Sequence, residues 1–463
     1  MKIKITKADI AWNYAGTILN IAMSSIILPV ILHWLSSVEI GLWYVFANIS
    51  SLISLIDFGF SPTIMRNISY AWSGAKQVKA EGFDQVTEDA EINYNLLSSL
   101  IISSKRLYLY ISLVAFILSI SVGSFYINSL LIKEAIPNKW QYLIAWIIYA
   151  IAIFINLYYS YWPPLLKGVG NIKDANKAIV ISKVVYIALG ASALLIGGGL
   201  IGLSLVFLVS GFVARYYSKK YFFKRVGKGN IQNKSDLSDF HTVFKAIWPN
   251  SRNLGIVTIG AWLITKSTTL ICSSFFGLTI TAQYGLSLQL FNLIFGFSSI
   301  AFSSFMPEIA SLKMYNDKQR YLSIFSLTLV VQWVIGILGS AILVLWGPGL
   351  LSIIHSNSQL LPTNVLILLA IVLFLEQNHS TFATFITMDN TVPFVKASII
   401  SGIAIVVVSI LSIKLTHLGI IALILSQGMV QLAYNNWYWP VYVIRREKLS
   451  FTSIISNAIN YIF

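Results

Sequence analysis

Long runs of apolar residues follow one another along almost the whole chain, and short polar segments separate them. A helix needs about 20 mainly apolar residues to cross a bilayer, and these runs reach that length. A membrane β-barrel would instead show alternating strands of about ten residues. The pattern predicts twelve spans, at about 10–33, 40–60, 106–127, 140–164, 178–197, 200–217, 248–275, 279–306, 321–346, 364–388, 396–415 and 418–443.

The composition supports an integral membrane protein. Of the 463 residues, 57% are hydrophobic and 11% are charged, whereas about 25% of the residues of a soluble protein are charged. The longest polar segment between two spans, at 215–245, is basic and follows the sixth span. We therefore expect an all-α polytopic fold with an N-terminal six-helix lobe at 1–217, a basic inter-lobe loop at 218–247 and a C-terminal six-helix lobe at 248–463.

The net charge of +15 could indicate nucleic-acid binding, but the positions of the bases argue against it. With the N-terminus inside, 28 of the 32 lysines and arginines fall in segments on the inner side. Such an asymmetry follows the positive-inside rule. It predicts a multi-pass protein of the cytoplasmic membrane with both termini and the basic loop in the cytoplasm, and membrane lipids rather than nucleic acid as its surroundings.

The second span of each predicted lobe begins alike. The sequence IGL stands at 40–42 and YGL at 284–286, and Pro62 and Pro307 follow at nearly equal distances. Transporters are often built from internal repeats of this kind, with the binding site between them. The match is short, so it indicates a repeat without proving one.

The stretch EIGLWYVFANISSLISLIDFGFSPTIMRNISYAWSGA at 39–75, the basic central loop and the twelve predicted spans resemble the O-antigen flippases. These are the Wzx-type polysaccharide transporters of the multidrug/oligosaccharidyl-lipid/polysaccharide exporter superfamily. The resemblance implies two six-helix lobes packed as a V around a central cavity. It also implies a bacterial inner-membrane protein of O-antigen or lipopolysaccharide biosynthesis. Its cargo would be a polyprenyl-diphosphate-linked oligosaccharide carried to the outer leaflet, and its partners other polysaccharide-assembly membrane proteins.

Three cations are candidates for binding an anionic cargo. Lys266 lies inside a predicted span, and an ionisable residue there is costly and therefore a functional candidate. Arg252 precedes it by fourteen residues, almost four helical turns, so we expect both on one face. The alternatives for Lys266 are that it snorkels to the outer interface or pairs with a structural acid.

Arg66 is the third candidate, because a guanidinium matches phosphate oxygens with two parallel hydrogen bonds. It and Asp57 flank Gly59 and Pro62, where a helix can end or bend. An ion pair between Asp57 and Arg66 that locks the helix end is the structural alternative. Polar stripes on the first two spans complete the predicted cavity lining: Asn13, Asn20, Ser50 and Ser54.

Ion coupling could involve Asp57 and a pair on the tenth predicted span, Glu376 and His379. Three residues apart, Glu376 and His379 share a helix face, and a carboxylate beside an imidazole can exchange a proton near neutral pH. Contacts between helices would give the same pattern, and we favour them slightly.

The sequence shows no catalytic constellation, no phosphate-binding loop and no metal-ligand spacing of its five histidines. We expect a transporter rather than an enzyme, with no cofactor. One rival is a drug/cation antiporter of the same superfamily, whose cavity should carry acids. The other is a membrane-embedded glycan polymerase or ligase, which would need a long external catalytic loop.

Overall fold

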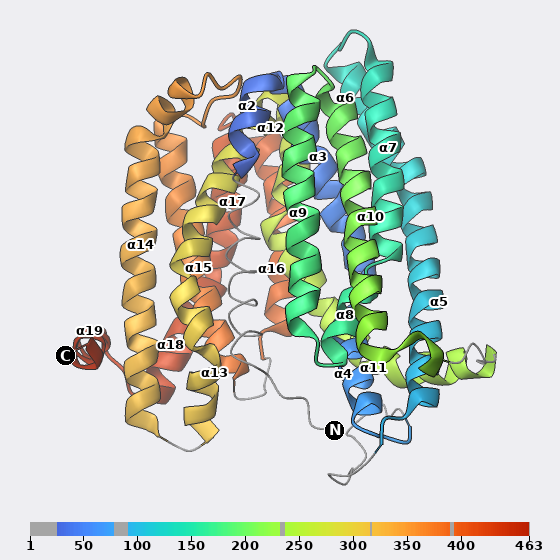
Figure 1. The fold of residues 1–463 in the computed structure, drawn as a ribbon. Coiled ribbons are helices and arrows are strands. Elements are labelled where there is room, and N and C mark those ends of the chain that lie inside the picture. The colour runs from blue at the N-terminus through green and yellow to red at the C-terminus, as the bar shows by residue number, and fades with distance from the viewer. Residues whose placement is uncertain (1–25, 78–90, 232–236, 315–316, 389–392, 463) are drawn as a thin grey trace. The chain divides into compact units, whose positions relative to one another are not determined.

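The computed structural model describes residues 26–77, 91–231, 237–314, 317–388 and 393–462, and all regular structure in these ranges is helical (Figure 1). The helices are α2 (Leu28–Trp34), α3 (Ser37–Ser54), η1 (Leu55–Asp57), α4 (Phe60–Trp72), α5 (Tyr94–Leu118), η2 (Ser119–Gly123), α6 (Ser124–Lys133), α7 (Lys139–Tyr158), α8 (Trp162–Gly168), α9 (Ile172–Leu195), α10 (Gly199–Val226), η3 (Lys228–Asn230), α11 (Leu237–Thr265), α12 (Ser267–Ser298), α13 (Ile300–Met314), α14 (Lys318–Ile353), α15 (Thr363–Thr387), α16 (Val395–Leu415), α17 (Ile420–Ala433), α18 (Asn435–Glu447) and α19 (Phe451–Ile462).

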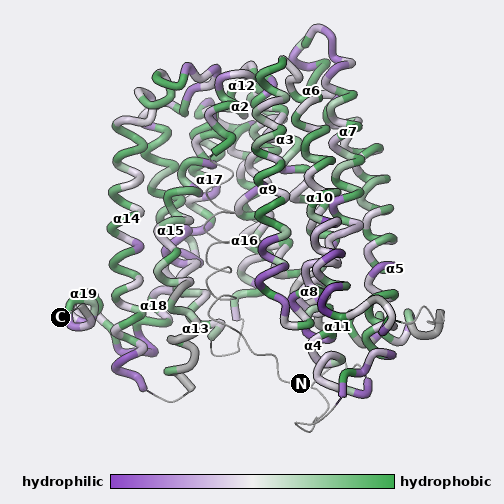
Figure 2. The backbone as a smooth tube through the Cα atoms, in the orientation of Figure 1, coloured by the Kyte–Doolittle hydropathy of each residue, from purple (hydrophilic) through white to green (hydrophobic). Residues whose placement is uncertain are grey.

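Nine helical segments of the described residues are long and apolar enough to cross a membrane. Figure 2 shows the apolar residues extending along most of the length of α5, α7 and α14. The predicted all-α polytopic membrane fold is confirmed. The predicted first span lies largely outside the described residues, and the last is divided into α17 and α18, each too short to cross a membrane alone.

One of the nine segments, Thr258–Ser298, contains parts of two predicted spans because the chain turns back inside it. Gly277 has φ +81°, and the Thr281 hydroxyl lies 3.7 Å from the Cys272 sulfur. In a straight helix nine residues would cover about 13.5 Å. The chain therefore reverses at Gly277, between the predicted spans that end at 275 and begin at 279.

The chain divides into two compact units. Unit 1 comprises Met1–Leu35 and Val45–Ile259, and unit 2 comprises Ser36–Tyr44 and Gly260–Phe463. In unit 1, α7 packs against α5 and α10, α9 packs along α10, and α4 packs against α8. Helix α10 continues to Val226, so the first part of the segment expected as the inter-lobe loop is helical.

An aromatic core holds unit 2 together. Phe325 of α14 stacks on Phe385 of α15 with ring centroids 4.1 Å apart, and Phe382 meets Phe325 edge-on. Phe302 of α13 and Trp439 of α18 belong to the same buried cluster. These contacts tie the helices that carry the polar residues of this unit into one body.

Close packing in unit 2 explains why the repeated sequences IGL and YGL both contain a glycine. A Cβ on Gly41 would stand 2.2 Å from the Leu278 carbonyl oxygen, and one on Gly285 would stand 2.6 Å from the Tyr44 ring. The Tyr44 hydroxyl also donates to Gln289 at 2.7 Å. The start of α3 thus packs against α12 so closely that each glycine makes room for a group of the other helix.

Candidate functional site

Asp57 lies at the turn where α3 ends and α4 begins. Residues 58 and 59 are both left-handed, with φ +44° and +69°, and they redirect the chain after η1. The Asp57 carboxylate accepts a 2.5 Å hydrogen bond from the Tyr108 hydroxyl of α5 and another from the backbone N–H of Ser61. The second bond satisfies a free donor in the first turn of α4. Asp57 is therefore an anchor for the helix end.

The ion pair considered between Asp57 and Arg66 is not formed. Arg66 is exposed on α4, and among the described residues no carboxylate pairs with it. The opposite face of α4 is buried, with Ile64 and Ile68 fully enclosed and Ser69 donating to the Gly168 carbonyl of α8. Packing of α4 on α8 thus holds Arg66 outward, and its charge is left unneutralised by the described residues.

Helix α11 packs against the same turn of unit 1. A Cβ on Gly255 would stand 2.4 Å from the Phe58 ring, so only glycine allows this approach. Trp248, two turns earlier, lies near both Phe58 and Phe60, with ring centroids 6.3 and 6.0 Å apart. Arg252 lies between Trp248 and Gly255 in the sequence and is exposed. The turn and α11 therefore present Arg66 and Arg252 from one packed unit.

Two serines of the predicted polar cavity lining, Ser50 and Ser54, make hydrogen bonds within the protein. Ser50 is half-buried and hydrogen-bonds the Tyr149 hydroxyl of α7, whereas the exposed Ser54 donates to the Ser51 carbonyl of its own helix at 2.6 Å. Asn13 and Asn20 lie outside the described residues.

Lys266 lies in unit 2 at a break between two helices. Helix α11 ends at Thr265, α12 begins at Ser267, and Lys266 between them has a non-helical φ of −121°. The reversal at Gly277 is eleven residues further on, about 16 Å along a helix; if that reversal marks the edge of the membrane, Lys266 lies near the middle of a hydrocarbon core about 30 Å thick. Its side chain is exposed. This depth argues against snorkelling, because a lysine stem is much shorter than the distance to the interface.

Glu376 and His379 lie on one face of α15, as their spacing predicts, and their side chains are 16% and 11% exposed. His379 Nε2 lies 3.9 Å from Glu376 Oε1, too far for a hydrogen bond. The other carboxylate oxygen accepts from Gln431 Nε2 at 2.7 Å, and His379 Nδ1 lies 2.8 Å from Asn436 Oδ1. The pair is largely buried, each member contacts one neutral amide, and the two are close enough to exchange a proton after a small movement.

The amides around this pair come from the break between α17 and α18. Tyr434 there has φ −146° and ψ −64°, which interrupts the predicted span. Gln431 accepts from Asn435 at 2.7 Å, and Asn435 also accepts from Trp439 and donates to Ser401. Sequence reasoning missed these residues, although amides four apart in an apolar run were a usable signal. Among the described residues, no group of three acidic, histidine or cysteine side chains could hold a metal.

Comparison with known proteins shows the fold. No family model matches the chain, and no curated protein matches it. An inward-facing multidrug resistance MATE family transporter of the MOP superfamily aligns with TM-score 0.63 and 14% identity over 92% of this chain and 95% of that one. The chain has the MOP transporter fold. An outward-facing MATE transporter aligns with TM-score 0.59 and 14% identity over 96% of this chain and all of that one. A MOP superfamily transporter from Pyrococcus furiosus Vc1 (DSM3638) aligns with TM-score 0.59 and 15% identity over the same shares.

The structure places one more cation within a membrane helix, although the sequence had assigned it to a segment on the inner side. Lys183 lies eleven residues after the start of α9, close to the middle of that 24-residue helix, and is half-buried. Among the described residues no carboxylate pairs with it. A lysine inside a membrane helix is a functional candidate for the same reason as Lys266, and its position within its own predicted span was the available signal.

Proposed function

We propose that this protein is a flippase that moves a polyprenyl-diphosphate-linked oligosaccharide from the inner to the outer leaflet of the bacterial cytoplasmic membrane by alternating access. The observation that carries the proposal is the charge left free on the membrane helices. Lys183, Lys266, Arg66 and Arg252 have no carboxylate partner in the described part of the chain. Cations without a carboxylate partner favour an anionic cargo, and two of these four, Lys183 and Lys266, lie within membrane helices.

Unlike these cations, the two acids considered for the site, Asp57 and Glu376, already have hydrogen-bond partners. The Asp57 carboxylate accepts from Tyr108, and that of Glu376 accepts from Gln431. A cation antiporter needs free carboxylates for its cargo, and these two are engaged in hydrogen bonds. The balance of free charge therefore supports the flippase over the drug/cation antiporter.

The MOP fold supports alternating access, because the similar structures include one inward-facing and one outward-facing MATE transporter. The similar transporter from Pyrococcus furiosus is described by a reverse polarity of its binding pocket that suggests a different function. Within this fold, the sign of the lining charge thus bears on the cargo. We infer that in this chain, too, the sign of the charge reflects the cargo: the charge is positive and the cargo is a diphosphate.

The chemistry of the step follows from these residues. The guanidinium groups of Arg66 and Arg252 would receive the diphosphate oxygens, Lys183 of unit 1 and Lys266 of unit 2 would each offset negative charge, and the prenyl chain would stay in lipid. Each negative charge moved outward across an inside-negative potential gains about 2.3 kcal/mol per 100 mV. Glu376 and His379 would add a coupled proton movement in unit 2.

A flipping assay tests the proposal. The purified chain is reconstituted in proteoliposomes with a fluorescent polyprenyl-diphosphate oligosaccharide, and a membrane-impermeant reagent measures its transfer between leaflets. We expect transfer by the unchanged protein, loss in Lys266→Ala, and normal transfer in Lys414→Ala, which removes an exposed lysine from the last turn of α16. Transport of an organic cation without transfer of the lipid-linked sugar would overturn the flippase.

A further inference from the structure

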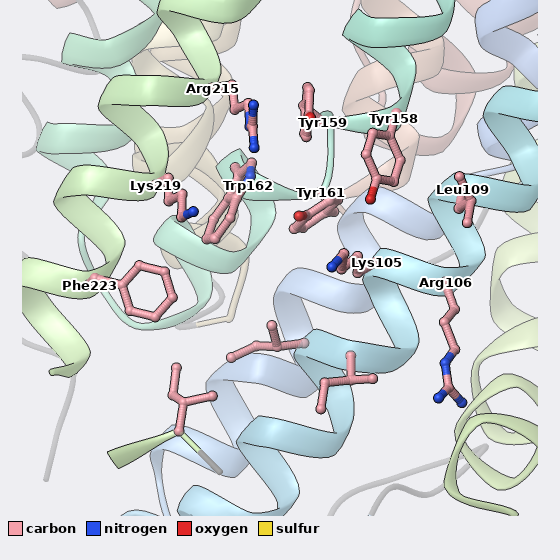
Figure 3. A pocket seen from close by; sticks show the side chains of 13 residues that line it. Lys105, Arg106, Leu109, Tyr158, Tyr159, Tyr161, Trp162, Arg215, Lys219 and Phe223 are labelled. Atoms are coloured by element: carbon pink, nitrogen blue, oxygen red, sulfur yellow. The ribbon is translucent and has the colours of Figure 1, made fainter. Parts of the chain in front are cut away.

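Unit 1 contains a pocket that the proposed transport step does not use. It has a volume of about 690 Å³ and lies between α5, the turn from α7 to α8, and α10 (Figure 3). This volume is within the range of about 300–1,000 Å³ that is typical of ligand sites. Its lining consists of cationic, aromatic and aliphatic residues: Ile101, Ile102, Lys105, Arg106, Leu109, Tyr158, Tyr159, Tyr161, Trp162, Arg215, Lys219, Phe223 and Ile231.

The lining is positively charged and contains no acid. Figure 3 shows Lys105 pointing from α5 toward Tyr161, and Lys219 pointing from α10 toward Trp162. The Arg215 guanidinium lies 4.0 Å from the centre of the Tyr159 ring. Three cations on two helices thus converge, and none has a carboxylate partner among the described residues. Bringing them together costs electrostatic energy that an anionic ligand would offset.

Two buried donors of the lining also lack a partner in the described structure. They are Trp162 Nε1 and Arg106 Nη1. Buried donors are almost always hydrogen-bonded in folded proteins, so these atoms indicate a missing acceptor. Arg106 points away from the other cations in Figure 3, whereas Trp162 lies next to Lys219 and Arg215.

The length of α7 indicates that the pocket lies at the depth of lipid headgroups. Helix α7 has 20 residues from Lys139 to Tyr158, a length of about 30 Å that matches the hydrocarbon core. The pocket begins where α7 ends. Tyrosine and tryptophan concentrate at this level of a membrane, and the positive-inside pattern predicts that it is the cytoplasmic side.

The aromatic wall is held in place before any ligand arrives. Pro163 and Pro164 stand in the first turn of α8 and restrict its backbone. The Trp162 ring meets Phe222 of α10 edge-on at 5.6 Å, and both Tyr161 and Trp162 are at most 5% exposed. A preformed wall lowers the entropy lost on binding.

We propose that this pocket binds the phosphate of an acidic membrane lipid, one with a net negative headgroup, in the leaflet at the α8 end of unit 1. Phosphate oxygens suit lysine, arginine and indole donors, and basic pockets between membrane helices recognise acidic headgroups. Two lipids carry this chemistry: a resident acidic phospholipid, and a polyprenyl diphosphate before transport. The inference does not depend on the proposed function, because lipid binding is measured without transport.

The test is lipid binding to the purified full chain in neutral detergent, followed by native mass spectrometry. The probes are phosphatidylglycerol, cardiolipin, undecaprenyl diphosphate and phosphatidylcholine. The pocket variant is Arg215→Gln with Lys219→Gln. Its matched control is Lys220→Gln with Lys224→Gln, which removes the same charge from α10 outside the pocket lining. A third variant, Lys105→Arg with Lys219→Arg, keeps the charge.

We expect the pocket variant to bind the acidic lipids about thirtyfold more weakly than the control does, a product of about fivefold for each cation removed. The charge-keeping variant should bind normally, which also shows that the pocket tolerates substitution. Preference for cardiolipin or phosphatidylglycerol identifies a resident lipid, and preference for undecaprenyl diphosphate identifies the carrier; both support the proposal. Equal binding by the pocket variant and the control, or equal binding of phosphatidylcholine, would overturn it.

Discussion

The hydrogen bond between Asp57 and Tyr108 allows a quantitative test of how the helix end is held. The bond is 2.5 Å long, Tyr108 is fully buried, and the acceptor is a carboxylate. A hydrogen bond to a charged group contributes about 1.5–3 kcal/mol. A double-mutant cycle of Asp57→Ala and Tyr108→Phe should therefore give a coupling free energy of about 1.5–3 kcal/mol, because losing the second partner costs little once the first is gone.

The assay is equilibrium unfolding in mixed micelles of sodium dodecyl sulfate and a mild detergent, with circular dichroism as the signal. The matched cycle replaces Tyr108→Phe by Arg66→Gln, an exposed residue without an ion pair to Asp57 in the described structure. Its coupling with Asp57→Ala should stay below about 0.5 kcal/mol. A larger coupling of Asp57 with Arg66 than with Tyr108 would refute the reasoning and restore the ion pair as the anchor.

Three further predictions concern unit 2. Lys266→Arg should keep surface glycan export in cells and Lys266→Ala should abolish it at an unchanged membrane level of the protein; normal export in Lys266→Ala would remove this lysine from the site. Glu376→Gln keeps an acceptor for its amide neighbour but cannot release a proton, so transport in proteoliposomes should proceed without responding to an imposed pH gradient; an unchanged response would make the acid structural. Gly41→Ala should lower the free energy of unfolding by about 1–3 kcal/mol through overpacking, whereas Gly349→Ala, with nothing within 4 Å of its added Cβ, should change it by at most about 1 kcal/mol; equal effects would disprove the close contact of Gly41 with Leu278.

Much of the fold could be predicted from local sequence. Apolar runs of sufficient length must become helices in lipid, because no water is available to bond their backbone groups. The reversal at Gly277 lies in the interval predicted between two spans, and the three-residue spacing of Glu376 and His379 brings them within 3.9 Å. These features depend only on helix periodicity and on the residues of one segment.

The partners of the charged groups could not be predicted in the same way. Asp57 bonds to Tyr108, which is 51 residues away, rather than to Arg66 on the next helix, and Glu376 bonds to Gln431, which is 55 residues away. The breaks at Lys266 and Tyr434 were likewise unexpected. Such pairings depend on which helices pack together and at what rotation, and a single sequence does not contain that information.

The sequence by itself determined that this chain crosses a membrane many times and which ionisable residues stand inside apolar runs, and it predicts that most of the bases lie on one side. Only the tertiary structure decided which of those charges are engaged and which are free, and that Lys105, Arg215 and Trp162 meet around one pocket. The physical reason is that burial in lipid is a property of each segment, whereas neutralisation of a charge is a property of two segments brought together by packing.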